Sequence, residues 1–128
     1  MTETNLAKFQ FIGYSISKAL IEVKKNEIGD TYSVSFEPKG KIDNTNSMFY
    51  LSLKILINDS KKLLYIEVCT TAKFKFNKKI PLKELDNYFF INAPAIVFPY
   101  IRAYIGTLTN LSGYNAINLP TLNLTALP

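Results

Sequence analysis

The sequence contains no histidine, no tryptophan and only one cysteine, Cys69. Without histidine the chain cannot build imidazole acid–base catalysis, His-ligated metal sites, or the Ser–His and Cys–His pairs of nucleophilic enzymes. The five glycines form neither a phosphate-binding loop nor a dinucleotide fingerprint, and the acidic residues Glu67, Glu84 and Asp86 are isolated in the sequence. We therefore predict a protein that is not an enzyme and needs no metal or cofactor.

Long apolar runs and disulfide pairs are also missing. The longest uncharged apolar run in the hydrophobic C-terminal part is Ala93–Ile101, which is shorter than the roughly 20 residues that a membrane span needs. The first residues lack the basic-then-apolar pattern of a signal peptide, and a single cysteine cannot pair within the chain. We expect a cytoplasmic protein without a membrane span. Its 128 residues suit one domain over residues 1–128 with one modest core.

Charged residues are present but unevenly distributed. Fifteen Lys and Arg against ten Asp and Glu give a net charge of +5, which weakly favours an acidic partner such as nucleic acid. From Tyr88 to Pro128 the only charged residue is Arg102. Such a segment is too polar for a membrane span and too large to be hidden inside a small domain. It therefore indicates an interface with another protein surface.

Apolar residues in the first half recur at the spacing of antiparallel strands. Four strands are predicted: Leu6–Val23, Tyr32–Phe36, Phe49–Ile57 and Leu64–Phe76. The first has apolar residues at both even and odd positions, which we interpret as a strand covered on different faces at its two ends. The second is expected to end at Pro38 and Gly40. A tight hairpin at residues 58–61 joins the third strand to the fourth.

One long helix is predicted in the second half, from about Ala93 to Leu111, after a helical turn at residues 81–85. Asn92 is expected to cap its start, Pro94 lies near the first helical position, and Gly113 ends it. An apolar stripe at helical spacing consists of Val97, Ile101, Ile105 and Leu108. The sequence thus predicts an α+β fold, a four-stranded antiparallel sheet with one long helix on its apolar face. One helix cannot cover such a sheet completely, so oligomerisation is expected.

Two features have a functional and a structural interpretation. Cys69 falls on the more polar side of the fourth strand, and no basic or helix-end environment points to a reactive thiol, so a structural role is favoured. The segment Lys73–Lys79 interleaves bases with Phe74 and Phe76, as single-strand binders do. Strand alternation explains it more simply, because the phenylalanines then point into the core and the lysines into water.

Two later segments resemble a known family. Residues 91–102 read Ile-Asn-Ala-Pro-Ala-Ile-Val-Phe-Pro-Tyr-Ile-Arg, and residues 116–124 read Ala-Ile-Asn-Leu-Pro-Thr-Leu-Asn-Leu. Both closely resemble the SecB family of export chaperones, in which Phe-Pro-Tyr-x-Arg at a helix start is a strong signature. A weaker match is Phe36–Asp43, where the family shows Trp-x-Pro and alternating apolar residues.

The resemblance implies an ATP-independent holdase that assembles as a homotetramer, a dimer of dimers. Family members bind non-native, export-bound polypeptides in long apolar grooves. The positions that match the family's groove are Phe36, Ile42, Phe98, Tyr100 and Leu124. For Phe98, packing in the core is an equal alternative.

The sequence departs from the family pattern in three ways. The family usually has a second helix beside the groove, whereas this sequence stops at Pro128, where that helix would begin. Family members dock on the SecA translocation motor through acidic positions, of which only Glu22 is matched, because Lys18 and Lys61 occupy two others. The net charge of +5 also contrasts with the acidic character of export SecB, and a basic surface would not attract the motor's basic docking tail.

Two alternatives remain beside a general export holdase. The first is a specialised chaperone for an antitoxin-type client, a role linked to some SecB-like proteins. The second is a basic structural or nucleic-acid-binding module that uses the lysine-rich face of the sheet. Nucleic acid is the less favoured partner, since the lysines and phenylalanines do not share one surface.

Overall fold

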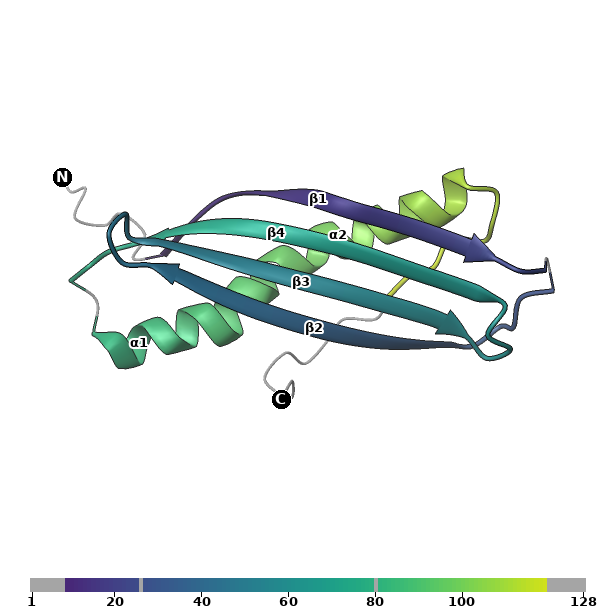
Figure 1. The fold of residues 1–128 in the computed structure, drawn as a ribbon, viewed down its shortest axis with the longest axis horizontal. Helices are drawn as coiled ribbons and strands as arrows, with labels where there is room; N and C mark the ends of the chain where they lie inside the picture. Colours follow the sequence, from purple (N-terminus) through teal and green to yellow (C-terminus); the bar gives the residue numbers. More distant parts are fainter. Residues whose placement is uncertain (1–8, 26, 80, 120–128) are drawn as a thin grey trace.

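A four-stranded sheet and one helical segment form two layers (Figure 1). The structure, a computed structural model, describes residues 9–25, 27–79 and 81–119. The antiparallel strands lie in the order β1-β4-β3-β2. Their bounds are β1 Phe9–Val23, β2 Tyr32–Asp43, β3 Met48–Asp59 and β4 Leu64–Phe76. The helical segment consists of α1 Leu82–Asn87, a π-helical turn η2 Tyr88–Asn92 and α2 Ala93–Leu111. The predicted α+β fold is confirmed.

Strand β1 keeps most of its apolar residues on the helix-covered face of the sheet because it contains two bulges. Its pairing with β4 shifts between Phe11 and Gly13 and again between Ile16 and Lys18. Each shift inserts one extra residue, Ile12 or Ser17, which reverses the parity of the side-chain alternation. The predicted strand covered on different faces at its two ends is therefore wrong. The β1 residues that pair with core-facing positions of β4 are Phe9, Phe11, Tyr14, Ile16, Ala19, Ile21 and Val23.

Strand β2 continues through Pro38 and Gly40 to Asp43, so the predicted end at Pro38 is wrong. This strand lies at the edge of the sheet, where a proline can turn its missing N–H outward without removing a ladder hydrogen bond. Gly40 has a steric role in the strand, because a Cβ at this position would lie 2.8 Å from Cε1 of Phe49. An edge strand with these two residues still pairs along its whole length with β3.

The helical segment begins at Leu82, well before the predicted start. Asn92 has helical backbone angles and its side chain makes no capping hydrogen bond, so its predicted role as N-cap is wrong. The predicted turn at residues 81–85 is the first turn of the same helix. Pro94 cannot donate a hydrogen bond to the preceding turn, and the wider π-helical turn lies directly before it. Gly113, with φ of +96°, lies just beyond the helix end, as predicted.

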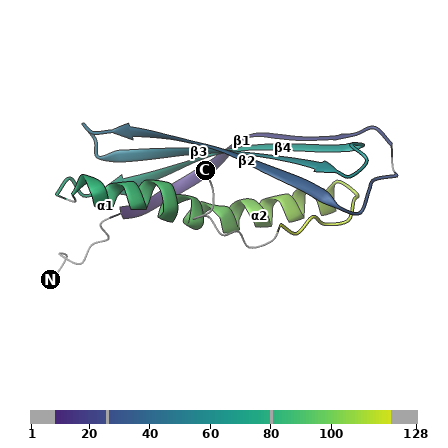
Figure 2. The ribbon, with the colours of Figure 1, turned by 90° about the horizontal axis from the view of Figure 1, so that it is seen from below.

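By length and composition alone, the segment Lys83–Leu111 could also cross a membrane. The sequence-based prediction that no segment is long enough to span a membrane considered only uninterrupted apolar runs, and so it did not include this longer helix. The apolar side of α2 lies against the sheet (Figure 2), where Val97, Ile101 and Ile105 are fully buried. Packing in the core therefore accounts for the apolar character of this helix.

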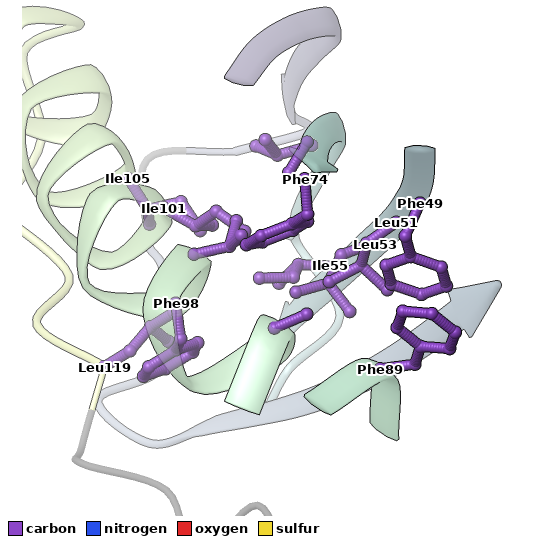
Figure 3. Packing of buried hydrophobic residues seen from close by; sticks show 14 of the residues in the cluster. Phe49, Leu51, Leu53, Ile55, Phe74, Phe89, Phe98, Ile101, Ile105 and Leu119 are labelled. Atoms are coloured by element: carbon purple, nitrogen blue, oxygen red, sulfur yellow. The ribbon is translucent and has the colours of Figure 1, made fainter. Parts of the chain in front are cut away.

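Aromatic rings dominate the core at the end of the sheet near the β2–β3 hairpin. The rings of Phe49 and Phe89 stack at 4.1 Å between centroids (Figure 3), and those of Phe9 and Phe74 stack at 4.7 Å. Phe76 contacts Phe89 edge-on at 5.5 Å. These rings join β1, β3, β4 and η2 into one packed cluster.

The opposite face of the sheet is not covered by any helix of the described chain (Figure 2), and we call it the open face. At its centre Glu67, 8% exposed, accepts a hydrogen bond of 2.7 Å from the Tyr65 hydroxyl. Its carboxylate also lies 3.0 Å from Nζ of Lys18 and 3.8 Å from Nζ of Lys54. The charged partners of Glu67 in these contacts are Lys18 and Lys54 of the neighbouring strands β1 and β3, and not a second carboxylate.

These contacts stabilise the charged form of Glu67. Hydrogen bonds from Tyr65 and Lys18 lower the pKa of Glu67 to about 2, against the desolvation that would raise it. The same hydrogen bond raises the pKa of Tyr65 to about 12. The Glu67 cluster therefore holds an ionised carboxylate between two lysines of different strands.

We predict that deleting Ser17 destabilises the protein strongly. Removing the bulge forces the apolar residues on one side of it, Ile16 or Ile21 among them, onto the open face, with an expected loss of about 2–4 kcal/mol. The measurement is urea unfolding followed by circular dichroism. Ser17→Ala keeps the residue count and is expected to stay within about 0.5 kcal/mol of the parent. A deletion variant as stable as the parent contradicts the assigned bulge.

We predict that Glu67→Gln flattens the acid dependence of stability. Because the folded pKa of Glu67 lies below its ordinary value of 4.5, its stabilisation is complete above about pH 4.5 and is lost as the pH falls toward 2. The melting temperature of the parent should therefore fall more steeply over this range than that of Glu67→Gln. Glu22→Gln, on the same face, serves as the matched control and should follow the parent. Equal slopes for the parent and Glu67→Gln would contradict the assigned cluster.

Candidate functional site

An apolar groove lies between the edge strand β2 and the start of the helical segment. Its volume is about 360 Å³, within the size range of ligand pockets, and it is open to solvent along one side. We call it the aromatic groove. Its lining residues are Pro38, Lys39, Gly40, Phe49, Leu51, Phe89, Phe90 and Pro94.

The floor of the groove is part of the core, and its rim is exposed. The stacked rings of Phe49 and Phe89 are 2% and 1% exposed, whereas Phe90 is 67% exposed. The π-helical turn places these two successive phenylalanines, Phe89 and Phe90, inward and outward. The close approach of Phe49 to Gly40 depends on the missing side chain at that position. The groove is therefore preformed, because the aromatic packing that stabilises the fold also fixes its floor.

The chemistry of the groove is apolar contact. Lys39 is the only lining residue with a charged side chain. Among the described residues, no group of three or more His, Cys, Asp or Glu is placed to hold a metal ion. Apolar contact has no preferred direction, so the groove can accept aliphatic and aromatic side chains in many orientations. The adjacent strand β2 adds an unpaired edge, on which an extended chain could form main-chain hydrogen bonds.

The structure brings two of the predicted groove residues together beside the aromatic groove. Phe36 on β2 and Phe98 on α2 meet edge-on at 5.8 Å between ring centroids. Phe98 is only 5% exposed, so it packs in the core as well as facing Phe36. Ile42, 45% exposed, lies further along β2 and lines a separate shallow depression. Leu124 lies outside the described residues.

Tyr100 lies on the other flank of the helix, above β1. Its ring is 5.0 Å from that of Tyr14 and 5.7 Å from that of Phe11. Tyr14 and Tyr100 are 40% and 45% exposed, so they form a second aromatic surface. The structure therefore does not place Tyr100 in the aromatic groove.

The segment after α2 closes part of the β2 flank. Thr109 accepts a hydrogen bond of 2.9 Å from the backbone N–H of Ile117 and donates to the Ile105 carbonyl at 2.8 Å. This link turns the chain back along the helix, and the buried Leu119 lies beside Phe98 (Figure 3). The described apolar flank is therefore open chiefly at the aromatic groove.

Sequence reasoning missed Phe49, Phe89 and Phe90 as groove residues. Phe49 was interpreted only as a core position of its strand. Phe89 and Phe90 precede the predicted helix start, so the pattern assigned them no role. The run Tyr88-Phe89-Phe90-Ile91 directly before the family-like motif was the available signal.

The predicted docking residue Glu22 lies on the open face, on the far side of the sheet from the aromatic groove. It pairs with Tyr65 across β1 and β4 and is exposed. Lys18 lies on the same face in contact with Glu67, and Lys61 lies in the turn between β3 and β4. The half-buried Cys69 is also there, with Sγ 3.8 Å from a carboxylate oxygen of Glu67.

Comparisons with known proteins agree on one family. The model of the family described as SecB, preprotein translocase subunit SecB, matches residues 21–127. The protein-export protein SecB of Magnetococcus marinus is 27% identical over 109 residues, which cover 77% of this chain and 69% of that protein.

A solved structure shares the fold. The SecB-like chaperone of Mycobacterium tuberculosis, in complex with a peptide from the HigA1 antitoxin, superposes with a TM-score of 0.76. It is 20% identical and covers 91% of this chain and 88% of its own chain. The fold comparison, the curated relative and the family match support the resemblance predicted from residues 91–102 and 116–124. Because the family match spans most of the sequence, the chain belongs to the SecB family.

Proposed function

We propose that the protein is an ATP-independent holdase that binds non-native polypeptides in the aromatic groove. The observation that carries this proposal is a preformed groove whose floor is aromatic and whose rim residue Phe90 is 67% exposed. Surface of this kind is costly to leave in water, and it is suited to covering apolar segments of another chain. The relatives of the chain are named as export and chaperone proteins, which supports the same activity.

Broad client recognition follows from the chemistry of the groove. Apolar side chains gain from burial without a fixed geometry, and the β2 edge offers main-chain groups that every polypeptide can match. Because Phe49 and Phe89 are already packed, binding does not have to order the floor. We propose that the protein acts in the cytoplasm and needs no cofactor for this binding.

A specialised client is the second candidate. The Mycobacterium tuberculosis SecB-like chaperone is in complex with an antitoxin peptide, and its fold matches this chain. We propose an antitoxin-type segment as an alternative client of the same groove. Competition between such a segment and a general unfolded client for one site would support this alternative.

We also propose that the chain assembles as a homotetramer, a dimer of dimers. The outer side of α2 bears small exposed or half-buried residues, and Arg102 is the only charged residue in α2. Small residues let two helices approach closely, and the lack of charge lowers the desolvation penalty of the contact. A shallow hollow on this side is lined by residues that include Arg102, Ala103, Gly106, Thr107 and Asn110.

The acidic docking of the SecA motor is not proposed for this chain. On the open face, Lys18 neutralises Glu67, and Glu22 is the only predicted docking carboxylate. A basic docking tail would meet lysines on the same surface and would be repelled.

We predict that Phe90→Ser weakens client binding. Loss of one buried phenylalanine contact is worth about 1.5–3 kcal/mol, so the Kd for a labelled unfolded polypeptide should rise roughly tenfold or more. Fluorescence anisotropy gives the Kd, and light scattering of a refolding client gives the holdase activity. The exposure of Phe90 predicts an unchanged melting temperature.

Ile12→Ser is the matched control for this experiment. Ile12 is 50% exposed at a bulge of β1, on the opposite edge of the sheet from the groove, so this variant should bind clients like the parent. Equal affinity of the parent and Phe90→Ser would refute the groove assignment. No delay of client aggregation by the parent at stoichiometric concentration would refute the holdase proposal itself.

We predict that Ala103→Glu disrupts the tetramer. A carboxylate introduced into a helix–helix contact without a partner leaves an uncompensated buried charge and costs several kcal/mol. Native mass spectrometry should show a shift from tetramer to smaller species. Lys62→Glu in the turn between β3 and β4 changes the charge away from this contact and should leave the mass unchanged. An intact tetramer for Ala103→Glu would place the contact elsewhere.

A further inference from the structure

The open face carries a concentration of lysines at the end near the β2–β3 hairpin. The strand register places Lys41, Tyr50 and Lys73 side by side on β2, β3 and β4. Lys39 and Lys75 lie two residues away along β2 and β4 and therefore on the same face. We call these four lysines around Tyr50 the lysine patch.

No lysine of the lysine patch belongs to an ion pair within the described part of the chain, and Lys41 interacts electrostatically with the nearby Asp43. Both ion pairs on the open face go to Glu67, which engages Lys18 and Lys54 further along the sheet. The nearby carboxylate of Asp43 accepts hydrogen bonds of 3.2 and 2.9 Å from the backbone and side chain of Asn46. All four lysines of the patch are exposed. This end of the face therefore carries four positive charges, and two carboxylates, Glu37 and Asp43, lie next to them on β2.

A shallow depression lies beside Tyr50, next to the lysine patch. Its lining residues include Lys41, Asp43, Asn44 and Thr71. Lysines two residues apart on one strand are spaced by roughly 6.7 Å, and the lysine rows on β2 and β4 are about 10 Å apart. Alternate side chains of an extended peptide have the same spacing of roughly 6.7 Å, so carboxylates at every second residue could follow one row.

We propose that the lysine patch binds an extended acidic segment of a partner polypeptide. Charge complementarity and the strand-like spacing of the lysines both favour this occupant. Single-stranded nucleic acid fits less well, because sheet faces that bind it present two or three stacking rings. Among the described residues, Tyr50 is the one aromatic ring in the lysine patch, because Phe74 and Phe76 are buried on the other face of the sheet.

This site is separate from the aromatic groove and does not rest on the proposed holdase activity. The groove lies on the helix side of the sheet, and the patch lies on the open face. Lys39, on the edge strand, borders the groove as well. A partner could therefore hold the open face while a client occupies the groove.

The test uses the full chain and a fluorescein-labelled peptide of alternating Glu and Ser. Anisotropy should show binding at low salt that weakens strongly when the salt is raised, because exposed charges are screened. The double variant Lys41→Gln with Lys73→Gln should bind this peptide at least about fivefold more weakly. The matched control, Lys61→Gln with Lys62→Gln, makes the same charge change in the turn between β3 and β4 and should bind like the parent.

Three results would overturn the proposal. They are equal loss of binding in the control variant, tighter binding of an oligothymidine than of the acidic peptide, and no binding of the peptide at low salt. Suppression of client aggregation by the parent and by the Lys41/Lys73 variant is measured in parallel. Failure of the peptide experiment with intact holdase activity rejects the lysine patch alone. Peptide binding without holdase activity rejects the proposed function alone.

Discussion

The helical segment is narrower than the sheet that it covers, and this difference in width determines how much of the sheet's apolar face stays uncovered. Four strands spaced about 4.8 Å apart give a sheet roughly 19 Å wide, including the outer halves of the edge strands. A helix with its side chains is only about 10–12 Å wide. The helical segment from Leu82 to Leu111 crosses one face of the sheet obliquely, from beside β2 to beside β1 (Figure 1), and leaves part of that face uncovered on either side. The aromatic groove lies on the β2 side of this segment, and the Tyr14–Tyr100 contact lies on the β1 side.

This incomplete coverage couples the groove to the stability of the fold. Phe49 and Phe89 stack in the core and also form the groove floor. A substitution at either position would create a cavity as well as alter the site, because buried aromatic rings contribute several kcal/mol. Rim residues such as Phe90 are free of this coupling. They are therefore the positions at which the proposed client binding can be altered without loss of the fold.

Local patterns in the sequence were sufficient for part of this architecture. The alternation over Phe49–Ile57 and Leu64–Phe76 predicted β3 and β4, and Gly113 marked the helix end, because these signals depend on residues close in the chain. The bulge residues Ile12 and Ser17 have no local signature, since only pairing with β4 reveals the change of parity.

Non-local context also explains the remaining errors. A proline such as Pro38 would end a central strand but is tolerated in an edge strand. The sheet order that makes β2 an edge strand is a property of the whole fold. None of the predicted groove residues in the described part of the chain lines the aromatic groove itself, although Phe36 and Phe98 lie beside it. Phe36 and Phe98 came from the family-like motifs, whereas Phe89 and Phe90 depend on a helix that continues upstream of Ala93.

The two faces of the sheet divide recognition into two kinds of chemistry. An apolar groove gains affinity from burial but distinguishes poorly between clients, because one methylene more or less changes binding by only about 1 kcal/mol. Charged groups discriminate more sharply, because a mismatched charge is repelled. On this chain the charged groups are concentrated on the strands and turns, and the helix that borders the groove has Arg102 as its only charge after Asp86. With the two proposed binding sites, selection among partners would depend on the open face more than on the aromatic groove.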